Sequence, residues 1–167
     1  MGFSYFTPNL SQTLDFEKDT TSFNWQNLKR DNTESNIGNF SSKVSESMEY
    51  GPAFTDTNID FSRKKTIVIG NAFIYPEQMR GGSLVLVVNK NGRDLYYKEI
   101  ALYKITTIEK KWQSFYFQYN IPPIDLKNCE LKFFFYNPSG SSYYIDDLNL
   151  RVFTDFGYST SKPQLIH

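Results

Sequence analysis

The chain has 167 residues, and its 18 basic and 18 acidic residues give a formal net charge of zero at pH 7. This length suits one domain with its own hydrophobic core, while the balanced charge lacks the basic footprint of a nucleic-acid-binding protein, and no stretch approaches a membrane span. Because Cys129 is the only cysteine and His167 the only histidine, an internal disulfide, Cys/His metal sites, and Ser-His-Asp and Cys-His triads are excluded.

The first predicted strand runs from Gln12 to Glu17, where alternation places Leu14 and Phe16 on one side and the two acids on the other. Residues 1–11 are predicted to be a lead-in, residues 12–153 the folded domain and residues 154–167 a tail. The polar stretch 26–38 predicts a long surface loop. Residues 40–45 and 50–55 then form a plausible pair of short strands.

The middle of the chain contains three further strand signals. Residues 66–74 form an apolar run that Pro76 stops, and Gly81-Gly82 turns the chain into the apolar run 83–88, which suggests a strand covered on both faces. The Asn91-Gly92 turn is a strong hairpin signal and predicts that residues 95–102 pair antiparallel with that run.

The last third of the chain alternates in the same manner. In residues 112–119, Trp112, Tyr116 and Gln118 share one face, and Pro122 and Pro123 end the strand. Residues 131–136 and 143–153 complete the pattern, and Phe134 and Tyr136 are possible neighbours of the Trp112 strand. The total of about nine strands, with turn signals between them, predicts an all-β fold, an antiparallel β-sandwich.

Two acidic motifs mark the ends of this pattern. Near the start lies Leu14-Asp15-Phe16-Glu17 with Trp25 further on, and near the finish lies the run Tyr143-Tyr144-Ile145-Asp146-Asp147-Leu148-Asn149-Leu150. Together they resemble the opening and closing strands of β-jelly-roll carbohydrate-binding modules of the galactose-binding-like type. The resemblance implies a jelly roll with a structural calcium ion. It also implies that Glu17 and either Asp147 or Asp146 are its ligands, oxygen donors of the kind calcium prefers.

A sugar-binding surface needs aromatic faces for stacking, and it needs amides, carboxylates or guanidinium groups for hydrogen bonds to hydroxyls. The chain offers such groups on the Trp112 strand, around the predicted hairpin, beside the Gly81-Gly82 turn and on the strand 131–136. The candidate ligand-binding residues are Tyr116, Gln118, Tyr96, Tyr97, Arg93, Asn89, Arg80 and Tyr136.

Other interpretations of these residues stay open at this point. Most aromatic side chains of such a domain belong to its core, and in the resembling modules Trp25 and Trp112 would be structural. The terminal acids can equally be solvated edge charges that oppose aggregation. No catalytic pattern surrounds the remaining carboxylates, which include Glu49, Glu77, Asp94, Glu99 and Glu109.

The hypothesis from the sequence is therefore a non-catalytic domain that binds a polysaccharide or another glycan. It would be an accessory part of a larger extracellular, periplasmic or cell-surface protein, without nucleic-acid partners or direct membrane insertion. The alternative is a structural or protein-interaction jelly roll without a sugar site. Because jelly rolls serve unrelated functions, the fold alone does not decide between them.

Overall fold

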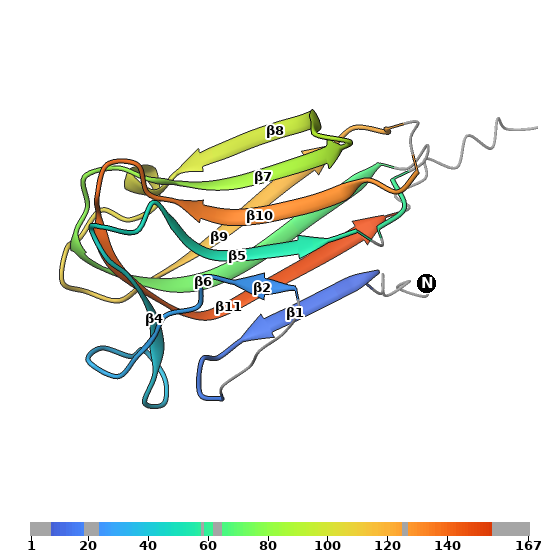
Figure 1. Ribbon diagram of the computed structural model, residues 1–167. Helices are drawn as coiled ribbons and strands as arrows, with labels where there is room; N and C mark the ends of the chain where they lie inside the picture. Colours follow the sequence, from blue (N-terminus) through green and yellow to red (C-terminus); the bar gives the residue numbers. More distant parts are fainter. Residues whose placement is uncertain (1–7, 19–23, 58, 62–64, 125–126, 155–167) are drawn as a thin grey trace, which may run out of the picture.

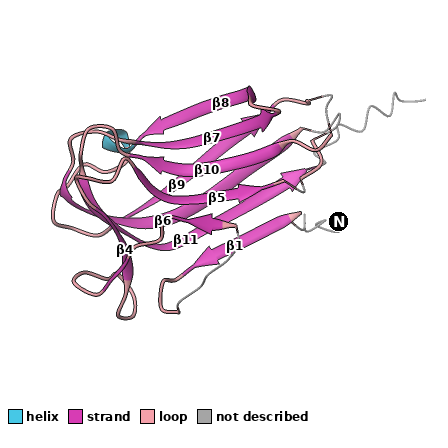
Figure 2. Ribbon diagram, in the orientation of Figure 1, coloured by secondary structure: helices cyan, strands magenta, loops and turns pink. Residues whose placement is uncertain are grey.

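Two antiparallel β-sheets pack face to face in the computed structural model, which describes residues 8–18, 24–57, 59–61, 65–124 and 127–154 (Figure 1). Sheet A contains β1 (Leu10–Leu14), β3 (Arg30–Asp31), β4 (Ser41–Val44), β6 (Thr66–Gln78), β9 (Gln113–Ile121) and β11 (Ser142–Thr154). Sheet B contains β2 (Trp25–Gln26), β5 (Tyr50–Asp56), β7 (Ser83–Lys90), β8 (Arg93–Ala101) and β10 (Glu130–Tyr136). The single helical element of the described part is the 3-10 turn η1 (Leu102–Lys104) (Figure 2). This architecture confirms the predicted all-β jelly-roll sandwich.

The long strand β11 organises sheet A. One edge of β11 pairs with β6, while its other edge pairs first with β4 and then with β1. Between these two partners the register with β6 shifts. Asp146 pairs with Phe73 and Asn149 pairs with Asn71, so β11 uses three residue steps where β6 uses two. Asp147 is the extra residue of this β-bulge and has a positive φ of 47°.

The core lies between the sheets and follows strict alternation on the central strands. In β9 the side chains of Phe115, Phe117 and Tyr119 are buried, whereas the residues between them are exposed. The Phe117 ring stacks on Phe133 of sheet B with 5.1 Å between ring centroids. Trp25 is also buried and packs on Phe54, which agrees with a structural role for this tryptophan.

Several local expectations are confirmed. β7 and β8 form the hairpin around Asn91-Gly92, where both residues have positive φ, and every residue of β7 from Leu84 to Val88 is buried. Leu14 and Phe16 both lie in the core. The first strand differs in extent, since β1 covers Leu10–Leu14 and so begins inside the predicted lead-in. Residues 155–167, most of the predicted tail, lie outside the described residues.

Two predicted strand neighbours are wrong. β9 pairs with β6 in sheet A, whereas β10 lies in sheet B, so Phe134 and Tyr136 are not neighbours of Tyr116. Likewise β4 and β5 belong to different sheets rather than forming a pair. In both cases the connection crosses from one sheet to the other, and alternation along a strand does not reveal such a crossing.

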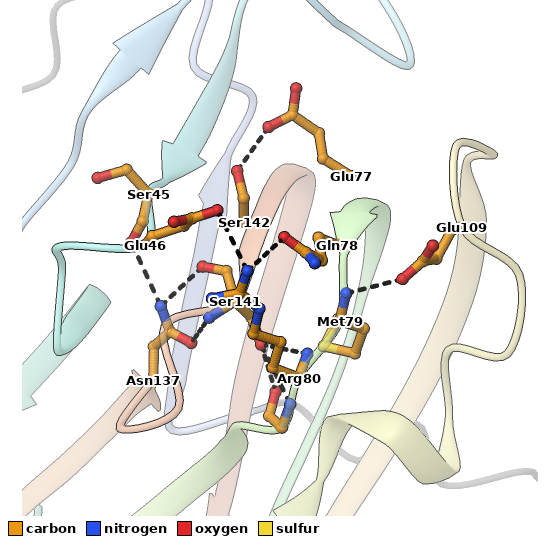
Figure 3. A network of polar contacts seen from close by, with 11 residues as sticks. Ser45, Glu46, Glu77, Gln78, Met79, Arg80, Glu109, Asn137, Ser141 and Ser142 are labelled. Carbon is orange, nitrogen blue, oxygen red and sulfur yellow. Dashed lines mark hydrogen bonds and ion pairs between the residues drawn. The ribbon is translucent and has the colours of Figure 1, made fainter.

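Asn137 and Ser141 tie three turns together at one end of the sandwich (Figure 3). The Asn137 amide donates to the carbonyl oxygens of Ser45, Met48 and Ser141, and its Oδ1 accepts the backbone N–H of Ser141. The Ser141 hydroxyl in turn accepts from the backbone N–H groups of Arg80 and Gly81. Both side chains are almost fully buried, so this network fixes the positions of the loops beside sheet A.

Candidate functional site

The outward side chains of sheet A form a continuous surface, here named the A face. The pairing register places Tyr116, Asn71 and Asn149 in one row across β9, β6 and β11. The next row contains Gln118, Ile69 and Arg151. Paired residues on neighbouring strands lie roughly 5 Å apart, so each row spans the sheet as a band of adjacent side chains.

A groove with a cavity volume of about 370 Å³ opens within these rows. Tyr116 stands at its side and is 79% exposed, more than any other large apolar or aromatic side chain of the described residues. The groove is lined by Ile69, Gly70, Asn71, Tyr116, Phe117, Gln118 and Arg151. An exposed ring beside planar amides and a guanidinium is the combination that sugar stacking and hydroxyl recognition require.

Gly70 is a buried position of β6 beneath this groove, in register with the core residues Phe117 and Leu150. A Cβ at this position would overlap Cζ of Phe117 and the backbone oxygen of Asn149. The Phe117 ring and the β11 backbone therefore occupy the space that a side chain would need. The glycine therefore lets the Phe117 ring and the β11 backbone pack closely in the core beneath the groove.

A second group of aromatic side chains lies further along the A face and is named the Trp112 cluster. It consists of Tyr75, Trp112 and Tyr144, with Tyr75 central: its ring centroid lies 5.6 Å from that of Trp112 and 6.1 Å from that of Tyr144. Trp112 is half-buried and faces outward with Tyr116. The A face thus carries rings at two positions along its strands.

A charged pair accompanies the Trp112 cluster. The Lys43 ammonium lies 3.5 Å from the Glu77 carboxylate and donates to the Tyr144 hydroxyl at 2.7 Å. The hydrogen bond with Tyr144, aided by Glu77, raises the pKa of Lys43. The hydrogen bond from the Ser142 hydroxyl, aided by Lys43, lowers the pKa of Glu77. Both groups are held in their charged forms beside the aromatic rings.

The acids of the two end motifs bind the same loop, residues 36–40, at the edge of sheet A. Along one edge of β11, β1 ends opposite Leu148 and β4 begins opposite Ile145. The segment after β1 and the loop before β4 therefore both lie next to the bulge at Asp147. Oε1 of Glu17 accepts the backbone N–H groups of Asn39 and Phe40 at 2.8 and 2.9 Å. The sequence predicted that the first and last strands lie near each other, and these hydrogen bonds show that Glu17 binds the loop before β4.

Asp146 binds the same loop from the other side. Its Oδ2 accepts the backbone N–H groups of Asn36 and Ile37, and its Oδ1 accepts that of Asp147. Its side chain is fully buried, and burial raises the pKa of Asp146 against the opposing effect of these hydrogen bonds. Gly38 of this loop packs against the Glu17 carboxylate, because a Cβ there would overlap Oε1 of Glu17.

These contacts bear on the calcium expected from the resemblance. Backbone N–H groups already donate to Oε1 of Glu17 and to both oxygens of Asp146, while Asp147 accepts only a long contact of 3.5 Å from the Asn36 amide. Within the described ranges, no three or more His, Cys, Asp or Glu side chains gather where they could hold a metal ion.

The outward side chains of sheet B form a second surface, the B face. Tyr97 of β8 and Tyr136 of β10 lie on it, so the structure brings these two candidates to the same sheet, away from Tyr116. Tyr50 packs against Tyr136 and Phe134 with centroid distances of 5.5 and 5.8 Å. Most of these rings therefore cover one another and the sheet beneath them.

The remaining candidates are distributed over other parts of the molecule. Tyr96 packs against the hydrophobic core. The Asn89 amide donates to Asp94 and its oxygen caps Gly92, which gives it a role in the hairpin turn next to the exposed Arg93. The Arg80 guanidinium donates to Gln78 in the loop network (Figure 3). None of these four contributes to the lining of the Tyr116 groove.

Sequence reasoning missed several residues of the A face, namely Asn71, Tyr75, Tyr144 and Arg151. Alternation alone placed Asn71 and Tyr75 on one side of a strand but did not show which side faced solvent. In β11 the bulge at Asp147 interrupts the alternation, so Tyr144 and Arg151 share a face although one is even-numbered and the other odd-numbered.

Known structures with a similar fold include several carbohydrate-binding modules. The CBM22-1 xylan-binding domain of Paenibacillus barcinonensis Xyn10C superimposes with a TM-score of 0.58 at 16% identity, covering 91% of this chain and 98% of the neighbour. The CBM22-2 xylan-binding domain of the same protein gives 0.57 at 14% identity, covering 84% of this chain and 98% of the neighbour. The C-terminal family 22 module of Clostridium thermocellum Xyn10B gives 0.52 at 15% identity, covering 87% and 92%.

No family model matches the chain, and no curated protein matches it by sequence. In the described part, no helix has the length and apolar character needed to cross a membrane. At these low identities the likeness establishes the architecture alone. The protein thus has the fold of β-jelly-roll carbohydrate-binding modules.

Proposed function

We propose that this chain is a non-catalytic carbohydrate-binding domain whose A face holds a glycan chain. The observation that carries the proposal is the highly exposed Tyr116 beside a groove of about 370 Å³ that also presents Asn71, Gln118 and Arg151. A sugar ring would stack on Tyr116 while the amides and the guanidinium bind its hydroxyls. The similar modules of Paenibacillus barcinonensis are xylan-binding domains, which supports this class of ligand.

The two positions of aromatic rings on the A face favour an extended ligand. Tyr116 and Trp112 are four residues apart on or next to the same strand, which places them about 13 Å apart along the strand direction. A chain of several sugar units can contact both positions, whereas a single sugar contacts one. The proposed ligand is therefore an oligosaccharide segment rather than a terminal sugar.

The described carboxylates support a binding role more than a catalytic one. Glu77 is paired with Lys43, Glu99 accepts from Tyr97, and Glu109 accepts the backbone N–H of Met79. These three carboxylates thus serve separate neighbours, and none of the described acids lines the groove at Tyr116. Glycoside hydrolysis needs two carboxyl groups on either side of one bond.

Affinity electrophoresis and isothermal titration calorimetry with a panel of plant and microbial polysaccharides test the proposal. We expect binding to at least one of them, and Tyr116→Ala should weaken it roughly thirtyfold, because truncation of a binding hot spot costs about 2 kcal/mol or more. Tyr103→Ala is the matched control, since Tyr103 is 59% exposed but lies on η1, outside the strands of sheet A. Absence of binding at millimolar ligand would contradict the proposal.

A protein-interaction domain is the second candidate function, and the B face favours it. Tyr50 and Tyr97 are 45% and 54% exposed, Phe134 and Tyr136 lie beside Tyr50, and charged groups such as the Lys132–Glu130 ion pair lie nearby. Aromatic surfaces with a polar rim are typical of protein interfaces. Loss of partner binding in Tyr50→Ser, with glycan binding retained, would assign the B face to this role.

We propose separately that calcium binds at the edge where Glu17 and Asp146 hold the loop 36–40, with Glu17 and either Asp147 or Asp146 as ligands and backbone carbonyls and water supplying the others. A bound ion would raise the melting temperature in calcium relative to EDTA, and Glu17→Gln should remove most of that difference. Glu46→Gln, at an exposed loop position elsewhere, is the control. An unchanged melting temperature in millimolar calcium would contradict the proposal.

The proposed setting is a larger extracellular, periplasmic or cell-surface protein. The similar modules of Paenibacillus barcinonensis support a multidomain context, because one of the matching structures contains two such modules in tandem. Detection of the full-length protein in the culture medium or the cell-wall fraction would test this location.

A further inference from the structure

The charges of the A face are distributed unevenly. Around the Trp112 cluster, Lys43 and Glu77 compensate each other at 3.5 Å. Around Tyr116, by contrast, Arg151 is the one charged residue among the described residues that line the groove, and the other lining side chains are apolar or amides. The chain has no net charge, so this positive site is a local feature of the groove.

Arg151 is both exposed and unpaired. Within the described ranges, neither a hydrogen bond nor an ion pair engages its guanidinium, whereas Arg30 binds the Phe16 and Glu17 carbonyls and Arg80 binds Gln78. Its nearest partners in register, Ser11 on β1 and Ile69 on β6, carry no charge. The five N–H donors of this guanidinium are thus available at the mouth of the groove.

A planar guanidinium matches a carboxylate with two parallel hydrogen bonds, and such charge-assisted pairs are about twice as strong as neutral ones. Arg151 lies one row from Tyr116 and two strands away, at about 10 Å across the sheet. A sugar ring stacked on Tyr116 can therefore present a carboxyl group, its own or that of a neighbouring unit, toward Arg151. A neutral chain would leave this charge with water as its partner.

We propose that the Tyr116 groove selects acidic glycans, with Arg151 binding the carboxylate of a uronic acid unit. This inference rests on the proposed carbohydrate-binding function and names its ligand class. Arg151 is the specificity-determining residue, Tyr116 supplies the stacking surface, and Asn71 and Gln118 bind hydroxyls.

Titration calorimetry with two probe pairs tests this specificity. The probes are an oligogalacturonate and a glucuronic-acid-substituted xylo-oligosaccharide, each compared with its own carboxyl-reduced, neutral form. We expect at least one acidic probe to bind roughly tenfold more tightly than its reduced form, and Arg151→Gln should remove that preference. The affinity for the acidic probe should fall with rising salt in the wild type and fall less in Arg151→Gln.

Arg93→Gln is the matched control, because Arg93 is an exposed arginine of the β7–β8 hairpin on the other sheet. It should keep the preference for the acidic probe, and an unchanged circular dichroism spectrum of Arg151→Gln would exclude unfolding as the cause. Equal binding of acidic and reduced probes, or binding only of neutral glycans from the wider panel, would overturn this inference and leave the proposed function in place. Absence of binding to every glycan would overturn both.

Discussion

The outer faces of the two sheets are both rich in aromatic rings, but the surroundings of those rings differ between the two faces. On the B face, Tyr50 contacts Phe134 and Tyr136, and the nearby charges of Lys132 and Glu130 pair with each other at 2.8 Å. On the A face, Tyr116 stands free beside a groove whose arginine has no partner in the described part of the chain. Aromatic content alone therefore does not distinguish the two faces, whereas an exposed ring beside an unpaired guanidinium does, and the proposed sugar site rests on that arrangement.

The largest effect should come from Gly70→Ala, which overfills the core beneath the groove. The added Cβ would clash with the Phe117 ring and the Asn149 backbone oxygen, and such overpacking typically costs about 1–3 kcal/mol. We expect a lower melting temperature by circular dichroism together with weaker glycan binding. The comparison control is Ala53→Ser on the B face, which should leave glycan binding intact. Unchanged binding by a folded Gly70→Ala variant would show that the site tolerates a displacement of β6 against β9 and β11.

Trp112→Ala and Phe134→Ala test the two faces against each other. Each removes a half-buried ring from one outer face, so both should lower stability. Only Trp112→Ala should also weaken oligosaccharide binding, by roughly tenfold, because it removes the second stacking position of the A face. Calorimetry below the melting temperature of both variants measures this difference. Equal losses of affinity would mean that the faces are not functionally distinct.

The smallest effect concerns the charged pair of the A face. Because the folded-state pKa of Glu77 is lowered, its ionised form adds stability above its unfolded pKa of about 4.3, and this contribution is lost as the pH falls through the folded value. Glu77→Gln should therefore be less stable than the wild type at pH 7, by less than about 1 kcal/mol because the group is partly exposed.

Urea unfolding at pH 7 and pH 3 measures this contribution, and the difference between Glu77→Gln and the wild type should disappear at pH 3. Glu130→Gln changes the corresponding ion pair beside the B face and is the control. A difference that persists at pH 3 would show that Glu77 acts through packing rather than through its charge.

The sequence predicted the sandwich and its strands well because alternation and turn chemistry are local properties. The Asn91-Gly92 hairpin and the buried side of β9 followed directly from them. It also predicted Tyr116 and Gln118 as members of one face, and the structure places both in the groove lining.

The rest of the candidate site depends on which strands become neighbours, and that is set by non-local pairing. Nothing near Arg151 in the sequence indicates that it lies across β6 from Gln118. Asn137 was missed for a related reason, since its amide matters only because three carbonyl groups, two of them distant in the sequence, converge on it.

The extra residue at Asp147 divides β11 into two halves whose side chains alternate in opposite order. Before it, even-numbered residues such as Tyr144 face outward, and after it odd-numbered residues such as Arg151 do so. Deleting this one residue would turn Arg151 toward the interior and bring Leu150 to the surface, while the half that pairs with β4 kept its orientation. Sequence alignments of related closing strands should therefore be made separately on each side of this position, because a gap placed elsewhere would exchange interior residues for outward-facing ones.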